Sequence, residues 1–94
     1  MKQKVKYLIQ GLRWFDKING NTYHTVIITD LINNELIHKS DCLVYGYDDQ
    51  YRQTAYDILI KKGLVNEKDR LNHTLNRERF IYSCVDVNRK KDLF

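Results

Sequence analysis

The sequence predicts an α+β domain in which a small antiparallel sheet packs against one helix, in the order β-β-β-α-β. With 94 residues, the chain has room for one domain. Apolar residues make up 43% and charged residues 30% of the chain, as in an ordinary globular protein. Apolar residues alternate with polar ones in the first half and again near the end, whereas the spacing between these regions is helical. We expect residues 1–94 to form this single domain, with residues 88–94 as a frayed tail.

The first strand is expected over residues 4–16, where β-branched and aromatic side chains alternate with polar ones. The alternation changes phase at Gly11, which predicts a bulge or bend there. Asn19-Gly20 then predicts a two-residue hairpin turn, which would set Trp14 opposite Thr25.

This register assigns the two faces of the first hairpin. Because Trp14 shares a face with the apolar Leu12 and Ile27, we expect it in the core. Arg13 and His24 are expected on the exposed face.

The next elements follow from turn and cap residues. A second strand over residues 23–31 and a third over residues 35–47 are expected on either side of a turn at Asn33-Asn34. Apolar residues at helical spacing predict a helix over residues 49–62, with Asp48-Asp49 as its N-cap. Gly63 then stands where a left-handed C′ residue is expected, with Leu64 folding back onto Leu59.

The last third of the chain is more polar. Residues 66–78 predict a loop with a helical turn that Asn66 could cap, and residues 79–87 predict the final strand. The apolar runs are far shorter than the ~20 residues that span a bilayer, and no signal peptide is recognisable. We therefore expect a cytoplasmic protein with no membrane partner. Cys42 and Cys84 are expected to be reduced core thiols.

Charge is unevenly distributed along a chain of net charge +4. Residues 1–17 sum to +4, residues 18–60 to −4 and residues 61–94 to +4. If the two basic ends meet in the fold, they could attract phosphate groups. A solvated surface explains the same pattern and is favoured for so small a net charge.

Motifs for catalysis or metal binding are absent from the sequence. There is no phosphate loop, nucleophile elbow, Cys-x-x-Cys pair or His-x-x-x-His pair. Asp16 and His24 could form an acid-base pair across the hairpin, but an ordinary surface contact is the favoured interpretation. We expect no catalytic residue, no metal and no cofactor.

Aromatic residues are the feature with a functional interpretation. They gather in the first hairpin and before the helix, the two places where Arg13 and Arg52 also lie. Interfaces with proteins use aromatic and arginine anchors, and single-stranded nucleic acids stack on sheet aromatics. For any single aromatic residue, burial in the core is the favoured explanation. The candidate partner-binding residues are Arg13, Trp14, Tyr23, His24, Tyr47, Tyr51 and Arg52.

Two segments, RWFDKINGNTYH at residues 13–24 and YGYDDQYRQTA at residues 45–55, resemble those of small bacteriophage and prophage proteins. The resemblance covers about residues 7–60 and implies a phage context. It carries no catalytic role.

The resemblance and the absence of enzyme motifs lead to one expected function. We expect a non-enzymatic phage accessory protein that binds a host protein, such as a defence nuclease complex, as anti-CRISPR inhibitors do. The alternative is a small nucleic-acid-binding protein that uses its basic ends, and an enzyme is the third choice. A homodimer stays open.

Overall fold

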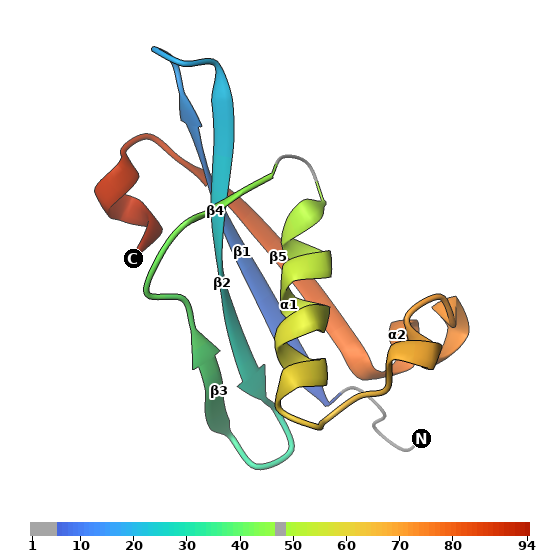
Figure 1. Cartoon of the computed structure of the whole chain (residues 1–94). Coiled ribbons are helices and arrows are strands. Elements are labelled where there is room, and N and C mark those ends of the chain that lie inside the picture. The colour runs from blue at the N-terminus through green and yellow to red at the C-terminus, as the bar shows by residue number, and fades with distance from the viewer. Residues whose placement is uncertain (1–5, 47–48) are drawn as a thin grey trace.

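The chain forms a five-stranded sheet with a helix across one face (Figure 1). The computed structural model describes residues 6–46 and 49–94. Its strands and helices are β1 (Tyr7–Asp16), β2 (Asn21–Asp30), β3 (Glu35–Lys39), β4 (Val44–Tyr45), α1 (Gln50–Lys61), α2 (His73–Arg79) and β5 (Phe80–Val87). Two 3₁₀ turns, Glu67–Asp69 and Lys90–Leu93, complete it. The predicted α+β class is confirmed.

The sheet is mixed, which corrects the prediction of an antiparallel sheet. Its order is β3-β2-β1-β5, and β4 pairs with β2. β1 and β2 form an antiparallel hairpin, whereas β5 runs parallel to β1. The chain reaches β5 through α1 and α2, and a crossover of this length allows a parallel strand.

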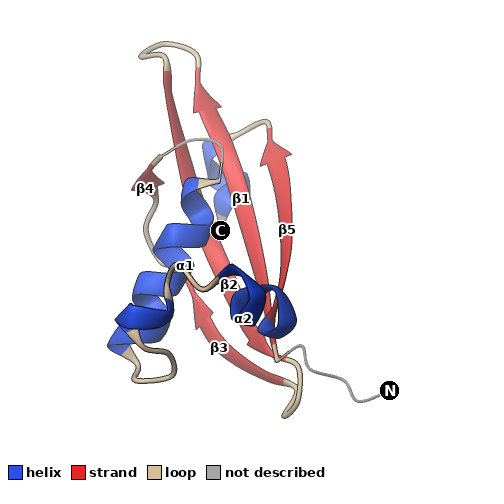
Figure 2. Ribbon diagram, turned by 90° about the vertical axis from the view of Figure 1, so that its right-hand side faces the viewer, coloured by secondary structure: helices blue, strands red, loops and turns tan. Residues whose placement is uncertain are grey.

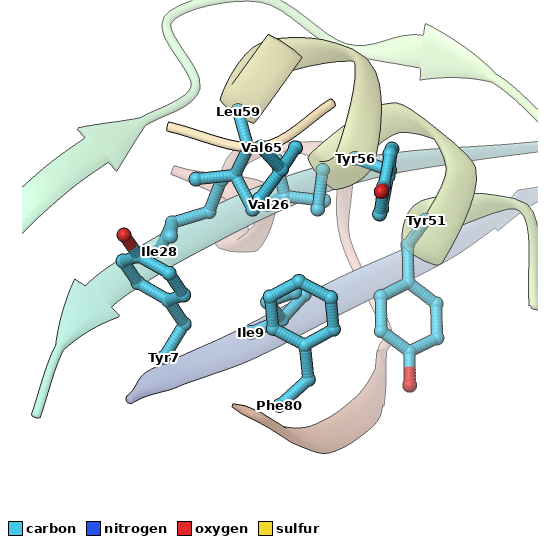
Figure 3. Close-up of a cluster of buried hydrophobic side chains, with 10 residues drawn as sticks. Tyr7, Ile9, Val26, Ile28, Tyr51, Tyr56, Leu59, Val65 and Phe80 are labelled. Atoms are coloured by element: carbon cyan, nitrogen blue, oxygen red, sulfur yellow. The ribbon is translucent and has the colours of Figure 1, made fainter. Parts of the chain in front are cut away.

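The core lies between α1 and one face of the sheet. Ile9 pairs with Ile28 and Gly11 with Val26 on the face that α1 covers. Figure 3 shows Ile9, Val26 and Ile28 on the strands, in one cluster with Tyr51, Tyr56 and Leu59 from the helix. The buried cluster comprises Tyr7, Ile9, Val26, Ile28, Tyr51, Ala55, Tyr56, Leu59, Val65 and Phe80.

Gly11 is a contact point for the helix. β1 pairs with β2 continuously through this residue, so the predicted bulge is wrong. A Cβ atom here would lie 2.5 Å from the ring of Tyr51, a distance that real Cβ atoms do not tolerate. Before Gly11, the apolar residues Tyr7 and Ile9 face α1, whereas Leu12 and Trp14 after it face the other side of the sheet. The apolar residues therefore change parity without a bulge.

The first hairpin has a longer turn than predicted. Asp16 pairs with Asn21, so the loop is the four residues 17–20 and Trp14 lies opposite Tyr23 instead of Thr25. The Asp16 carboxylate accepts from the backbone N–H of Ile18, and Gly20 has φ +72°. The register error is two residues, and an even shift preserves the face of every side chain.

Helix α1 begins and ends close to the predicted residues. Asp49 occupies the N-cap position, but its side chain makes no capping hydrogen bond, and Asp48 lies outside the described residues. At the other end, Gly63 has φ +75° and donates to the Ile60 carbonyl, while Leu64 donates to that of Leu59. This pair of bonds is the Schellman motif. Val65 is the residue buried after it, whereas Leu64 is exposed.

Two other segments differ from the prediction. The third strand is interrupted after Lys39, where the Ser40 hydroxyl accepts from the backbone N–H of Val26 and donates to its carbonyl. Residues 73–79 form a helix capped by the Asn72 side chain, which accepts from Leu75 N–H at 3.1 Å.

The C-terminal residues form a packed element in place of the predicted frayed tail. The 3₁₀ turn Lys90–Leu93 lies on the opposite side of the strands from α1 (Figure 1), and Leu93 is buried there. The Leu93 carbonyl accepts a hydrogen bond of 2.6 Å from the Thr25 hydroxyl.

The tip of the first hairpin extends beyond α1 (Figure 2). Within the described ranges, no helix is long and apolar enough to cross a membrane.

Candidate functional site

The structure separates the predicted partner-binding residues into buried and exposed groups. His24 and Tyr51 are buried, with 0% and 2% exposure, because both face the interior between α1 and the sheet. The assignment of His24 to the exposed face was therefore wrong. Tyr47 lies outside the described residues.

His24 holds the start of α1 against the sheet. Its Nδ1 lies 3.1 Å from the Gly46 carbonyl oxygen and its Nε2 lies 2.7 Å from the Thr54 hydroxyl. A carbonyl oxygen can only accept, so Nδ1–H donates to it and Nε2 accepts from Thr54. Burial lowers the pKa of His24. The side chain is thus a neutral structural group, and it forms no pair with Asp16.

Arg13 lies on the same face of the hairpin as His24 but is partly exposed. Its Nε donates to Asp86 of β5 at 2.8 Å, which links the hairpin to the neighbouring strand. Phe15 follows on this face, nearer the hairpin tip, with 53% of its surface exposed.

Trp14 and Tyr23 lie on the other face, where Tyr45 of β4 joins them. The Trp14 and Tyr23 rings stack at 6.0 Å, and Tyr45 meets Tyr23 edge to face at 5.9 Å. We call Trp14, Tyr23 and Tyr45 the aromatic strip. Trp14 and Tyr23 are half-buried, whereas Tyr45 is 61% exposed. The expectation that Trp14 belongs to the core under α1 is therefore wrong.

The aromatic strip adjoins an apolar tip. Ile18 in the hairpin loop is 93% exposed, and Val44 beside Tyr45 is partly exposed. The projecting arm, defined as residues 13–23 together with β4, thus presents rings and aliphatic groups to solvent on both of its faces. Exposed apolar groups gathered in this way are typical of interaction surfaces.

Arg52 lies away from the aromatic strip, on the side of the sheet covered by α1. Its guanidinium group stacks on the ring of Tyr82 in β5, 4.1 Å from the ring centre. It lines a pocket of about 400 Å³ together with Arg70 and Arg77. The predicted candidate residues therefore do not form one surface.

Sequence reasoning missed Tyr45 as a member of the strip, although the register of β4 against β2 places it beside Tyr23. The signal was present, because Tyr45 is an aromatic residue in the segment predicted as the third strand. Sequence reasoning also missed Arg70 and Arg77 of the pocket, which come from residues 66–78, the region predicted as a loop.

The described part of the chain contains no group of three or more His, Cys, Asp or Glu side chains arranged to hold a metal ion. Cys42 and Cys84 are free, and Cys42 is exposed, contrary to the expectation of a core thiol. Burial raises the pKa of the Cys84 thiol.

No protein-family model, curated protein or solved structure matches this chain.

Proposed function

We propose that this protein is a non-enzymatic phage accessory protein that binds a host protein through the projecting arm, and that it inhibits a host defence system in the manner of anti-CRISPR proteins. The observation that supports the interface is the aromatic strip. Trp and Tyr are enriched among the residues that contribute most binding energy in protein interfaces. The phage context and the class of partner rest on the resemblance of residues 13–24 and 45–55 to phage proteins.

The arm is suited to insertion between elements of a partner. The molecule measures 47 × 26 × 24 Å, so it is elongated. The hairpin tip extends beyond α1, which leaves both faces of the arm accessible (Figure 2). Rings that already stack on each other lose little side-chain freedom on binding, and such preorganisation favours affinity.

The test is affinity capture from a lysate of the bacterial host, with and without nuclease treatment. We expect a host protein to be retained in both conditions by the wild-type protein and lost with Tyr45→Ala. Tyr45 is exposed on a two-residue strand, so its truncation should leave the fold intact, which circular dichroism checks.

Ile32→Ala is the matched control, because Ile32 is 59% exposed, against 61% for Tyr45, but lies in the turn between β2 and β3. Retention of the partner by Tyr45→Ala, or its loss with Ile32→Ala, would contradict the interface. Capture that disappears with nuclease would favour the alternative function of nucleic-acid binding.

A further inference from the structure

A second surface, independent of the projecting arm, lies between α1, α2 and the start of β5. We call it the arginine groove. Its volume is about 400 Å³, which falls within the roughly 300–1,000 Å³ of small-molecule sites. The residues lining it are Arg52, Gln53, Tyr56, Arg70, Leu71, Asn76, Arg77, Phe80 and Tyr82.

Aromatic rings form one wall of the arginine groove and hold guanidinium groups in place. Tyr56 meets Phe80 edge to face at 6.1 Å, and Phe80 lies 5.9 Å from Tyr82. Arg52 stacks on Tyr82, with 4.1 Å between the guanidinium carbon and the ring centre. The guanidinium carbon of Arg79, which does not line the groove, lies 5.0 Å from the centre of the Phe80 ring. Rings thus fix the position of positive charge without neutralising it.

One arginine of the groove is already balanced by carboxylates. Arg70 donates to Asp57 on α1 and to Glu67 in the 3₁₀ turn, and its Nη1 donates to Gln53 at 2.7 Å. These bonds raise the pKa of Arg70 further above its ordinary value. Arg70 is therefore a structural residue that joins the 3₁₀ turn to the helix.

The positive charges of the other arginines are not offset by a carboxylate at close range. Arg79 donates to Asn76 and to the Tyr56 hydroxyl, which are both uncharged. Arg52 reaches a carboxylate, that of Asp49, only at 4.0 Å. Arg77 makes no ion pair with any described residue.

The exposed side of Arg52 offers a stacking surface. The Arg52 side chain is 43% exposed although its guanidinium group covers the ring of Tyr82, so part of the group remains accessible to a ligand. Leu71, 78% exposed, contributes an apolar side chain to the lining of the same groove. Guanidinium planes stack on nucleobases, and their N–H groups bind phosphate oxygens. An acidic peptide would use the charge but not the planar surface.

We propose that the arginine groove binds a nucleotide unit, with its phosphate on Arg77 and Arg52 and its base stacked over Arg52 beside Leu71. The shared chemistry is a phosphate next to a planar base, supplied either by a free nucleotide or by single-stranded nucleic acid.

The test measures binding of a fluorescein-labelled 12-mer of thymidine nucleotides by fluorescence anisotropy between 50 and 200 mM salt. We expect the double variant Arg52→Gln/Arg77→Gln to bind at least tenfold more weakly. Its salt dependence should also fall, by about 1.4 in the slope of log K against log salt, because each lost phosphate contact removes about 0.7. Lys17→Gln/Lys39→Gln is the matched control, since it removes the same charge from exposed sites outside the groove and should change affinity less than threefold.

Further probes separate charge from stacking and identify the source of the nucleotide. Arg52→Lys keeps the charge, so weaker binding of the 12-mer but not of an abasic 12-mer supports a stacked base. Displacement of the 12-mer by adenosine monophosphate indicates a site for free nucleotides, and its failure to displace indicates a site for strands.

Three outcomes would overturn the proposal: no binding of either ligand, an equal loss of affinity in the control double variant, or equally tight binding of a poly-glutamate peptide. Thermal melting of each variant shows whether the fold is retained. If Arg52→Gln/Arg77→Gln unfolds, Arg77→Gln alone replaces it, because Arg77 is exposed and makes no ion pair with a described residue.

Discussion

His24 shows how a polar side chain is accommodated in a small core. It is a residue of β2 and is fully buried beneath α1, yet both ring nitrogens have hydrogen-bond partners, Gly46 and Thr54. Burying a polar group without hydrogen bonds costs several kcal/mol, so these two bonds are needed for His24 to occupy the site. They also tie the residues before α1 to the helix itself, since Thr54 lies in its first half.

The burial of His24 makes folding sensitive to acid. Its pKa in the folded protein lies below the ordinary value of 6.5, chiefly because burial disfavours the charged ring. The unfolded chain therefore binds a proton more readily, and the stability contributed by neutral His24 is complete above pH 6.5. We expect the free energy of unfolding to fall as pH drops below 6.5 towards the lowered pKa, as measured by urea denaturation at pH 7.5 and 5.5.

The variant His24→Gln should flatten this pH dependence, whatever its overall stability. His38 is the control, because its pKa is lowered by a milder burial and by Lys62. If the pH dependence of the free energy of unfolding survives in His24→Gln and vanishes in His38→Gln, His38 and not His24 causes the effect.

At the scale of elements, the two hairpin turns are built in the same way. Asp16 and Asp30 each begin a four-residue loop and accept from the backbone N–H two residues later. Each carboxylate also accepts from the asparagine three residues later, and these bonds lower the pKa of both acids. The fourth loop residue is left-handed, Gly20 in one turn and Asn34, with φ 55°, in the other. The pattern Asp-x-Ile-Asn followed by Gly or Asn is thus a repeated turn, which sequence reasoning did not detect.

The end of α1 depends on the backbone of Gly63 rather than on space around it. Nothing lies within 4 Å of the position a Cβ would take, and φ is +75°. We expect Gly63→Val to lower the free energy of unfolding by about 1 kcal/mol or more, because a β-branched residue resists left-handed angles.

Gly63→Asn provides the comparison for that variant. Asparagine tolerates the left-handed region better than other side chains, so it should cost clearly less than valine in the same chemical denaturation experiment. Equal losses for the two variants, or no loss with valine, would show that φ at this position does not limit stability.

Across the whole molecule, the sheet is covered differently on its two faces. Helix α1 covers one face, and the C-terminal 3₁₀ turn covers only part of the other. Ile81 and Val85 of β5, which pair beside Leu8 and Leu12, remain partly exposed on that second face. The aromatic strip and the arginine groove therefore lie on opposite sides of the sheet, so both could be occupied together.

The C-terminal turn is expected to stabilise the whole domain. Leu93 is 3% exposed, whereas the adjacent Phe94 is 50% exposed. We expect Leu93→Ala to lower the free energy of unfolding by about 2–3 kcal/mol, as truncation of a buried leucine does, and Phe94→Ala to change it by less than about 0.5 kcal/mol. Urea denaturation measures both, and a Leu93→Ala protein as stable as wild type would mean that the turn does not contribute to the fold.

Local patterns in the sequence determined the α+β class, the extent of α1 and its glycine cap. They also determined which residues of the first hairpin share a face. These features follow from contacts between neighbours in the chain, since periodicity and left-handed φ preferences act over a few residues. The hairpin register was wrong by two residues, because the Asp16 carboxylate accepts hydrogen bonds from within the loop and so stabilises a four-residue loop instead of the two-residue turn Asn19-Gly20.

Tertiary structure alone decided which face α1 covers, the parallel pairing of β5, the burial of His24 and the docking of Leu93. It also decided the two candidate sites: β4 brings Tyr45 to Tyr23, and the crossover through α2 brings Arg77 towards Arg52. Each of these contacts joins residues distant in the chain. Their pairing depends on which surfaces pack together, and no local preference specifies that.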